Sequence, residues 1–179
     1  EVTGTPIRHE LFNGKKAKGL ALCGFKDEKP CLLVVGGSQG ANVMNVCVRQ
    51  ALDNLCKDYQ VIHLCGKGKV DNALVGKTGY YQLEYANKEL ADLFAASELV
   101  ISRAGANALY EILALGKPHV LIPLSRQASR GDQIQNARYF QQQGISVVVK
   151  EEAVVDIQEA EMVNMLKEKK QEQEEKEAI

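Results

Sequence analysis

The sequence predicts an α/β fold: a Rossmann-like, doubly wound parallel sheet of about six strands with helices on both faces. Short apolar runs rich in β-branched residues recur along the chain, at 31–35, 59–64, 80–85, 99–102, 119–122 and 145–149. Their nearly continuous apolar character is typical of strands covered on both faces. Helical patterns separate them, at 43–55, 88–96, 107–115 and 133–143. This alternation of strand and helix favours a parallel sheet.

The first 30 residues precede the first predicted strand and are rich in residues that break regular structure. They include Pro6, Gly14, Gly19, Gly24 and Pro30. We therefore expect residues 1–30 to be an irregular segment, an interdomain linker that leads into the domain, and not a domain of their own.

Helix ends are marked in the later part of the chain. Asn87 is placed to cap a helix that begins at Lys88. Gly116 and Gly144 are placed to end their helices, and Pro118 follows Gly116 where a helix cannot continue. These signals support the predicted order of elements.

The chain is expected to have one folded domain, residues 31–155, followed by a different kind of sequence. Residues 156–179 end in a run of mixed charges from Lys167 to Glu177, which fits a solvated helix or a frayed tail. The chain does not begin with Met and starts on a linker-like stretch. We expect it to be part of a larger protein whose N-terminal half is missing.

Composition narrows the class of function. The net charge is −1, and the few aromatic residues are not interleaved with basic runs, so nucleic acid and anionic membranes are not expected partners. The five cysteines are widely spaced without a Cys-x-x-Cys pair, which predicts buried reduced thiols. The three histidines are dispersed, so neither a metal nor a cofactor is expected. No apolar run is long enough to span a bilayer and no signal peptide is evident, which predicts a soluble cytoplasmic chain.

Two glycine-containing turns each follow a predicted strand and open a predicted helix. The first is Gly36-Gly37-Ser38-Gln39-Gly40, and the second is Ala104-Gly105-Ala106-Asn107-Ala108. Glycine permits close approach of a ligand, and the free N–H groups at a helix start favour an anion such as a diphosphate. The first turn matches neither the dinucleotide fingerprint nor a P-loop. Its alternative interpretation is a tight turn that needs glycine only for helix packing.

Glu111 lies one turn beyond the second glycine turn. A carboxylate in this place can accept both hydroxyl protons of a ribose while staying clear of the phosphates. The alternative is an acid in the first turn of a helix, favoured there by the helix dipole.

A third segment, residues 122–133, leaves a strand end and is dense in hydrogen-bonding side chains. In open α/β sheets, ligands bind outside the carboxyl ends of the strands. Asp132 is either a ligand-binding residue or an ordinary helix N-cap with Gln133 in the first turn. Arg126 and Arg130 are also read as solvated loop charges.

Together these segments resemble the donor-binding C-terminal half of the MurG family of bacterial UDP-N-acetylglucosamine transferases, which have the GT-B fold. The resemblance spans residues 2 to about 155. The segments that carry it are Thr3-Gly4-Thr5-Pro6-Ile7-Arg8, Gly36-Gly37-Ser38-Gln39-Gly40-Ala41, Glu84-Tyr85-Ala86, Ser102-Arg103-Ala104-Gly105-Ala106 with Glu111, and Gly131-Asp132-Gln133-Ile134-Gln135-Asn136-Ala137. Other GT-B enzymes share parts of this pattern.

The resemblance implies a role for each residue of the donor site. Arg8 and Ser38, in the turn with Gly37 and Gln39, would contact the diphosphate. The N–H groups of Ala106, Asn107 and Ala108, after Gly105, would hold the α-phosphate. Glu111 would bind the ribose hydroxyls, and the backbone around Ala86 would recognise uracil. Asp132 and Gln133 would hold hydroxyls of the sugar; the family's usual pair here is Gln-Gln, so Asp132 is a departure.

The implied reaction is inverting transfer of N-acetylglucosamine from UDP-N-acetylglucosamine to undecaprenyl-diphosphate-linked N-acetylmuramoyl pentapeptide. The acceptor site, the candidate base and the membrane-facing patch belong to the missing N-terminal half. This chain is therefore expected to bind donor, to be inactive alone, and to need no metal because N–H groups and a cation stabilise the leaving diphosphate. The full-length protein would be peripheral on the cytoplasmic face of the membrane.

Three alternatives remain open from the residues. One is a stand-alone donor subunit that docks onto a membrane partner, as in the eukaryotic two-component N-acetylglucosaminyltransferase. Another is the UDP-sugar half of a GT-B enzyme with a different acceptor, such as a glycolipid synthase. The third is a nonenzymatic α/β regulatory module, which predicts no nucleotide affinity.

Overall fold

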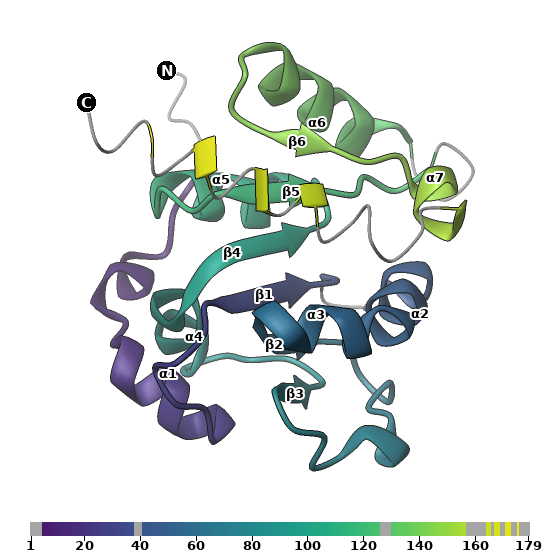
Figure 1. The fold of residues 1–179 in the computed structure, drawn as a ribbon. Helices are drawn as coiled ribbons and strands as arrows, with labels where there is room; N and C mark the ends of the chain where they lie inside the picture. The colour runs from purple at the N-terminus through teal and green to yellow at the C-terminus, as the bar shows by residue number, and fades with distance from the viewer. Residues whose placement is uncertain are drawn as a thin grey trace.

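The computed structural model describes residues 5–37, 41–125 and 130–156, and residues 164, 165, 167, 168, 171, 172 and 175. Its six strands are β1 (Cys31–Val35), β2 (Gln60–Leu64), β3 (Tyr80–Leu83), β4 (Ser97–Ser102), β5 (His119–Leu121) and β6 (Val147–Val148). They form one sheet in the order β3-β2-β1-β4-β5-β6, and every neighbouring pair is parallel (Figure 1). The predicted fold class is confirmed.

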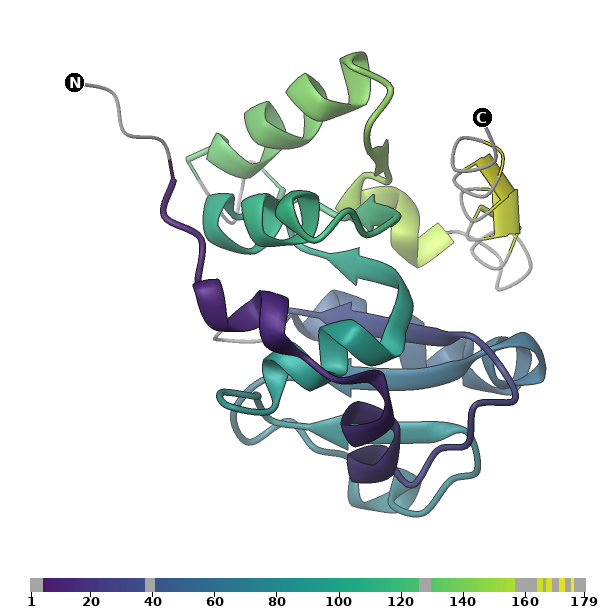
Figure 2. The same cartoon turned by 90° about the vertical axis from the view of Figure 1, so that its left-hand side faces the viewer.

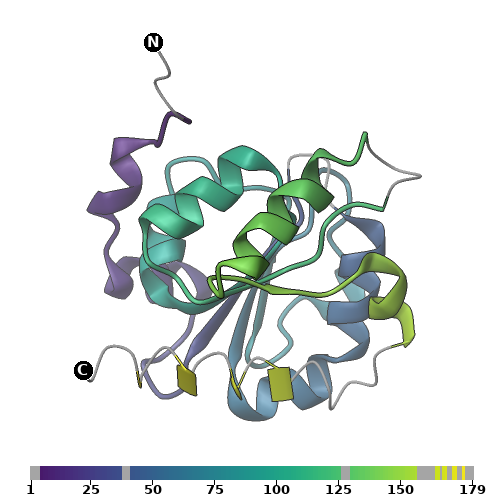
Figure 3. The same ribbon diagram turned by 90° about the horizontal axis from the view of Figure 1, so that it is seen from above.

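Helices cover both faces of this sheet (Figure 3). They are η1 (His9–Asn13), α1 (Lys16–Cys23), α2 (Asn42–Gln50), α3 (Leu52–Asp58), η2 (Asn72–Leu74), α4 (Leu90–Ala96), α5 (Ala106–Ala114), α6 (Asp132–Gln142) and α7 (Glu151–Asp156). Side chains alternate along each strand. Leu32 and Val34 of β1 pack with α2 and α3, while Leu33 packs on the other face with α1 and α4. The sheet is therefore buried on both sides, as its continuous apolar strands predict.

Two local predictions about the helices are wrong. The segment 43–55 is two helices, because the chain turns at Ala51, which ends α2 and precedes α3. Asn87 does not cap a helix at Lys88: α4 begins at Leu90, and no side chain caps it. The Asn87 N–H instead donates to the carboxylate of Glu89, at 3.3 Å. The ends marked by Gly116 and Gly144 are confirmed, with φ of 62° and 69°.

The leading segment is only partly irregular, because its described residues include η1 and α1. Helix α1 packs along α4, and Leu20 and Cys23 of α1 are buried in the core between them. The packing is very close. A Cβ added to Gly14 would lie 2.0 Å from Ala91 O, and one added to Gly19 would lie 2.2 Å from Asp92 O. Glycine at these two positions lets the leading segment lie directly against the backbone of α4. In the sequence alone, a glycine needed for such close packing looks the same as a glycine in a loop.

The described residues of the C-terminal range 156–179 are helical. Met165 packs against the core on the α2 and α3 face, and Lys167 Nζ lies 2.7 Å from Asp58 Oδ2. In the described parts of the chain, no helix is both long enough and apolar enough to cross a membrane. None of the five cysteines, all of which lie in the described residues, forms a disulfide, and four of them are buried. The prediction of buried reduced thiols is therefore confirmed for four of them, while Cys56 is half-buried. Burial raises the pKa of Cys23 and of Cys31 to about 12, which lowers their reactivity.

The imidazole of His63 is a polar group buried in the core beneath α2. His63 of β2 is fully buried, with Nδ1 2.9 Å from the Tyr80 hydroxyl and Nε2 2.9 Å from Asn45 Oδ1. Because the Asn45 amide nitrogen donates to Cys65 O, its oxygen faces the ring, so Nε2 carries the hydrogen. Burial, with the nearby charge of Arg49, lowers the pKa of His63 to about 3.

We expect this histidine to make the protein less stable in mild acid. The unfolded chain binds a proton at His63 below about pH 6.5 while the folded chain does not, so stability is complete above that pH and falls as the pH drops towards 3. At pH 5 this group should lower the free energy of unfolding by about 2 kcal/mol relative to pH 7.5. Urea unfolding at the two pH values measures it. His63→Gln should show a smaller difference between the two pH values, and an unchanged difference would contradict the assignment.

Candidate functional site

The candidate site lies at the edge of the sheet where the parallel strands end. Figure 1 shows β1 and β4 pointing towards the side where α2 and α7 lie. The strand order reverses between β1 and β4, and in open α/β sheets the crevice at such a reversal is the usual ligand site. The two glycine turns found in the sequence follow these two strands. Arg103 N–H donates to Val35 O, at 3.3 Å, and joins their ends.

The first turn is described only at its start. Gly37 has φ 85°, a left-handed conformation that favours glycine. Ser38, Gln39 and Gly40 lie outside the described residues, as do Arg126 to Ser129 of the third segment. The structure therefore places Gly37 at the site's edge.

The second turn leads into the start of α5. Gly105 occupies the N-cap position, and among the described residues no side chain makes a capping hydrogen bond there. Ala106 and Asn107 are exposed, and Ala108 is half-buried. The first N–H groups of a helix have no acceptor within the helix. This helix start therefore offers donors and a partial positive charge to an anion.

Gly105 is not required by the conformation of the chain. Its φ is −66°, which any residue can adopt. Among the described residues, the nearest atom to an added Cβ would be Gln133 Nε2, at 3.8 Å, which is ordinary contact. A glycine without a conformational or packing need is consistent with close approach of a ligand to the backbone.

Glu111 is buried in α5, five positions after the helix starts, with its side chain 8% exposed. It is paired with Arg8: Nε lies 2.6 Å from Oε1, and Nη2 lies 2.8 Å from Oε2. Figure 2 shows the purple N-terminal segment, which carries Arg8, running past α5. The alternative interpretation of Glu111 as an acid in the first helical turn is wrong, because α5 has no acid in its first turn.

The third segment meets the second turn through the start of α6. Gln133 Oε1 accepts a hydrogen bond from Leu124 N–H, at 3.1 Å, and its Nε2 lies beside Gly105. Asn136 Nδ2 donates to Ala104 O, at 3.0 Å. The structure thus brings together residues 104–105 and Gln133, which are far apart in the sequence.

Asp132 is the first residue of α6 and is exposed. The N-cap interpretation of this residue is wrong: Gly131 occupies the N-cap position, with φ 92°. Asp132 already has helical backbone angles, so its carboxylate does not have the geometry of a cap.

Ala86 lies after β3 at the same edge of the sheet. It is half-buried and packs against the apolar cluster that includes Ile112, the residue after Glu111. Nearby, Glu84 Oε1 accepts a hydrogen bond from Gly68 N–H, at 2.8 Å. The backbone around Ala86 is thus held on the same side of the sheet as α5.

Sequence reasoning missed a buried ion pair behind the second turn, between Arg103 and Glu151, which we call the clamp. Arg103 donates from Nη1 to Ile122 O, at 3.0 Å, and pairs through Nη2 with Glu151. The other oxygen of Glu151 accepts from Ser125 N–H, at 3.0 Å. Although burial opposes its ionisation, these two donors lower the pKa of Glu151 below its usual value. The Arg103 motif is visible in the sequence, but its partner 48 positions later is not.

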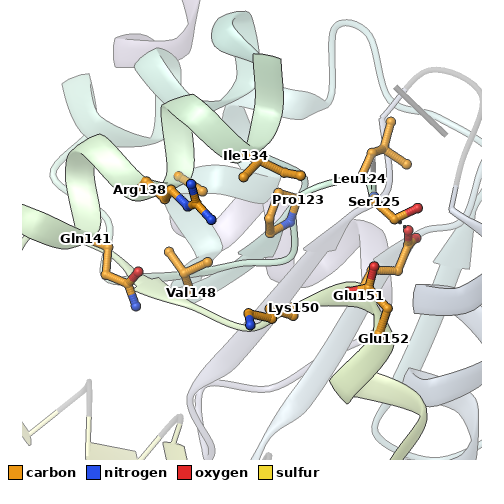
Figure 4. A pocket seen from close by; sticks show the side chains of 11 residues that line it. Pro123, Leu124, Ser125, Ile134, Arg138, Gln141, Val148, Lys150, Glu151 and Glu152 are labelled. Atoms are coloured by element: carbon orange, nitrogen blue, oxygen red, sulfur yellow. Dashed lines mark hydrogen bonds between the residues drawn. The ribbon is translucent and has the colours of Figure 1, made fainter. Parts of the chain in front are cut away.

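A cavity of about 570 Å³ lies beside this clamp, between α6, β6 and α7. Figure 4 shows Arg138 and Gln141 on one side of it, and Ser125 and Glu151 on the other. Leu124 lines the cavity through its side chain and holds Gln133 through its N–H. The clamp therefore supports the loop that positions Gln133.

The assembled groups suit a molecule that has both an anion and hydroxyl groups. The α5 N-terminus supplies N–H donors, Glu111 is an acceptor for hydroxyl hydrogens, and Gln133 Nε2 is a further donor. Across the described ranges, no cluster of three or more His, Cys, Asp or Glu side chains is arranged to hold a metal ion.

Comparisons with known proteins agree with this picture. A UDP-N-acetylglucosamine–N-acetylmuramyl-(pentapeptide) pyrophosphoryl-undecaprenol N-acetylglucosamine transferase of Legionella pneumophila is 71% identical over 152 residues, which is 85% of this chain and 42% of the relative. The enzyme of the same name from Clostridium botulinum is 57% identical over 155 residues, 87% of this chain and 44% of the relative. The chain therefore spans less than half the length of these curated relatives.

The crystal structure of Acinetobacter baumannii MurG has a similar fold, with a TM-score of 0.66 at 23% identity over 93% of this chain and 47% of that one. Together with the 71% and 57% sequence identities, this similarity of fold confirms the resemblance to the MurG family seen in the sequence. The pattern that defines the glycosyltransferase family 28 C-terminal domain matches residues 31–179. The chain belongs to glycosyltransferase family 28 and carries its C-terminal domain.

Proposed function

We propose that this chain is the donor-binding half of an inverting glycosyltransferase. The enzyme would transfer N-acetylglucosamine from UDP-N-acetylglucosamine to undecaprenyl-diphosphate-linked N-acetylmuramoyl pentapeptide, the reaction named for its Legionella and Clostridium relatives. The observation that carries the proposal is the grouping of an open helix start, a buried carboxylate and Gln133 around Gly105. In a nucleotide sugar the diphosphate joins the ribose to the sugar, so the helix start would lie between the ribose at Glu111 and the sugar at Gln133.

Each group would bind one part of the donor. The N–H groups of Ala106, Asn107 and Ala108 hold the diphosphate, together with Ser38 and Arg8. Glu111 accepts the ribose hydroxyls, and the backbone around Ala86 contacts uracil. Because Gln133 Oε1 already accepts from Leu124, its Nε2 is the atom that donates to a sugar oxygen. Asp132 is exposed beside it and supplies a second contact to the sugar.

The chemical contribution of this half is electrostatic. Negative charge grows on the diphosphate as the glycosidic bond breaks, and N–H groups already aimed at it, with the Arg8 cation, stabilise that charge. This design needs neither a metal nor another cofactor. The acceptor site and the general base are supplied by the N-terminal domain of the same protein, which also makes the contact with the cytoplasmic face of the membrane. The chain alone would bind donor without turnover.

The test is calorimetric titration of the chain with UDP-N-acetylglucosamine, UDP-glucose and UDP. We expect UDP-N-acetylglucosamine to bind most tightly, and Glu111→Gln to weaken all three at least about tenfold, since hydrogen bonds to a charged group are worth about 1.5–3 kcal/mol. Glu28→Gln, which alters an exposed carboxylate, is the matched control and should leave binding unchanged. Equal affinity for the two sugars would favour another UDP-sugar enzyme, and no binding of UDP would contradict a donor site.

A further inference from the structure

Two residues that the proposed function places on different parts of the donor are bonded to each other in the free chain. Arg8 and Glu111 form a fork in which each carboxylate oxygen accepts one N–H, at 2.6 and 2.8 Å. The Glu111 side chain is 8% exposed and the Arg8 side chain is 46% exposed. The arginine thus covers the carboxylate from the solvent side, and a ribose cannot reach both oxygens until the arginine leaves.

Arg8 is able to leave without disturbing the fold. It lies in extended backbone, with φ −70° and ψ 112°, just before η1, and the packed core of the leading segment begins after it, at Leu11. Rotation of its half-exposed side chain is therefore enough to break the pair. Breaking it does leave a buried carboxylate without its cation, which is costly unless another group takes the cation's place.

A diphosphate at the start of α5 would lie within reach of the same guanidinium. Glu111 is five positions after Ala106, and a helix rises about 1.5 Å per residue, so the two positions are about 7.5 Å apart along the axis. A swing of the arginine side chain covers this distance. Phosphate and carboxylate are both acceptors that match the guanidinium fork, so the diphosphate competes directly with Glu111 for Arg8.

We propose that Arg8 is a specificity-determining residue that makes ribose binding at Glu111 conditional on a diphosphate. In the free chain Arg8 occupies Glu111. When the donor binds, Arg8 moves to the diphosphate, and Glu111 is released to the two ribose hydroxyls. A nucleoside without phosphates must displace the arginine and offers it no new partner, so it is rejected. This inference rests on the proposed function, because it takes the ribose and diphosphate positions from it.

The test compares uridine with UDP on the chain and its variants, by titration followed in ¹⁵N NMR spectra. Arg8→Ala removes the competitor of the ribose and also a phosphate ligand, so the two effects have opposite signs. We expect uridine to bind at least about fivefold tighter to Arg8→Ala than to the unaltered chain, and UDP at least about fivefold weaker. Lys18→Ala removes an exposed positive charge from the same segment and should change neither affinity. Arg8→Lys keeps the positive charge but cannot make the two-pronged hydrogen bond, so its affinities for uridine and UDP should lie between those of the unaltered chain and Arg8→Ala.

A second readout is taken on the unaltered chain, and a variant serves only to assign the signal. The Nε–H signal of Arg8 in the unaltered chain, identified by its loss in Arg8→Lys, should shift when UDP is added and stay in place when uridine is added at the same concentration. A signal that UDP does not move would overturn the proposal.

The outcomes separate this inference from the proposed function. UDP could bind the unaltered chain while Arg8→Ala binds uridine no more tightly than the unaltered chain does. In that case Arg8 does not block ribose binding at Glu111, and only the inference fails. If UDP does not bind the unaltered chain at all, the donor site itself is wrong, and both fail.

Discussion

Gly105→Ala should remove most of the affinity for UDP while leaving the stability of the protein nearly unchanged. The added methyl group would meet only Gln133 Nε2, at 3.8 Å, among the described residues, and the backbone angles are allowed for alanine. A poorer N-cap costs about 0.5–1 kcal/mol, and the stiffer unfolded chain returns about 0.4–1 kcal/mol. The methyl group would, however, occupy the space through which a diphosphate approaches the N–H groups. We expect a loss of at least about 2 kcal/mol in binding, or roughly 30-fold.

The same substitution at the other end of α5 is the control. Gly116 has φ 62° and nothing within 4 Å of an added Cβ, so Gly116→Ala is strained but touches no ligand. It should cost about 1 kcal/mol of stability and leave UDP binding intact. Urea unfolding and calorimetric titration of both variants measure the two quantities. Destabilisation of Gly105→Ala by more than about 2 kcal/mol would show that the glycine serves the fold. Normal UDP binding by Gly105→Ala would show that no diphosphate approaches the backbone at this position.

Gly19→Ala should destabilise the protein by about 1–2 kcal/mol, although alanine is the better helix former. The substitution gains about 1 kcal/mol in intrinsic helix propensity. Against this, the new Cβ would lie 2.2 Å from Asp92 O and 2.8 Å from Ala96 Cβ. The first contact is with backbone, so a side-chain rotation cannot relieve it, and α1 must move away from α4. Overpacking of this kind costs about 1–3 kcal/mol and sometimes more.

Lys18→Ala, at an exposed position of the same helix, is the matched control for the change in helix propensity and should be nearly neutral. Urea unfolding of the two variants decides the matter. If Gly19→Ala is as stable as the unaltered chain, α1 does not pack against α4 in solution, and the anchoring of the segment that holds Arg8 would need another explanation.

The order of strands and helices follows from local features of the sequence. Apolar β-branched runs such as 31–35 and 99–102 can be read as strands because a strand buried on both faces needs apolar residues at consecutive positions. Gly116 and Gly144 can be read as helix ends because a left-handed residue there favours glycine. The two glycine turns and Glu111 were found in the same way, since each is a feature of a few adjacent residues.

Features that depend on the path of the chain could not be read in this way. Gly14 and Gly19 look like loop residues until α4 is seen to lie against them. Arg8 and Glu111 are 103 positions apart, and Arg103 and Glu151 are 48 apart, so nothing in their neighbours indicates either ion pair. The sequence by itself determined the fold class, the turns at the carboxyl ends of the strands and the residue types available to a ligand. Only the tertiary structure decided which of those residues are already bonded to one another, because ion pairs and close helix contacts form between segments that meet only after the chain has folded.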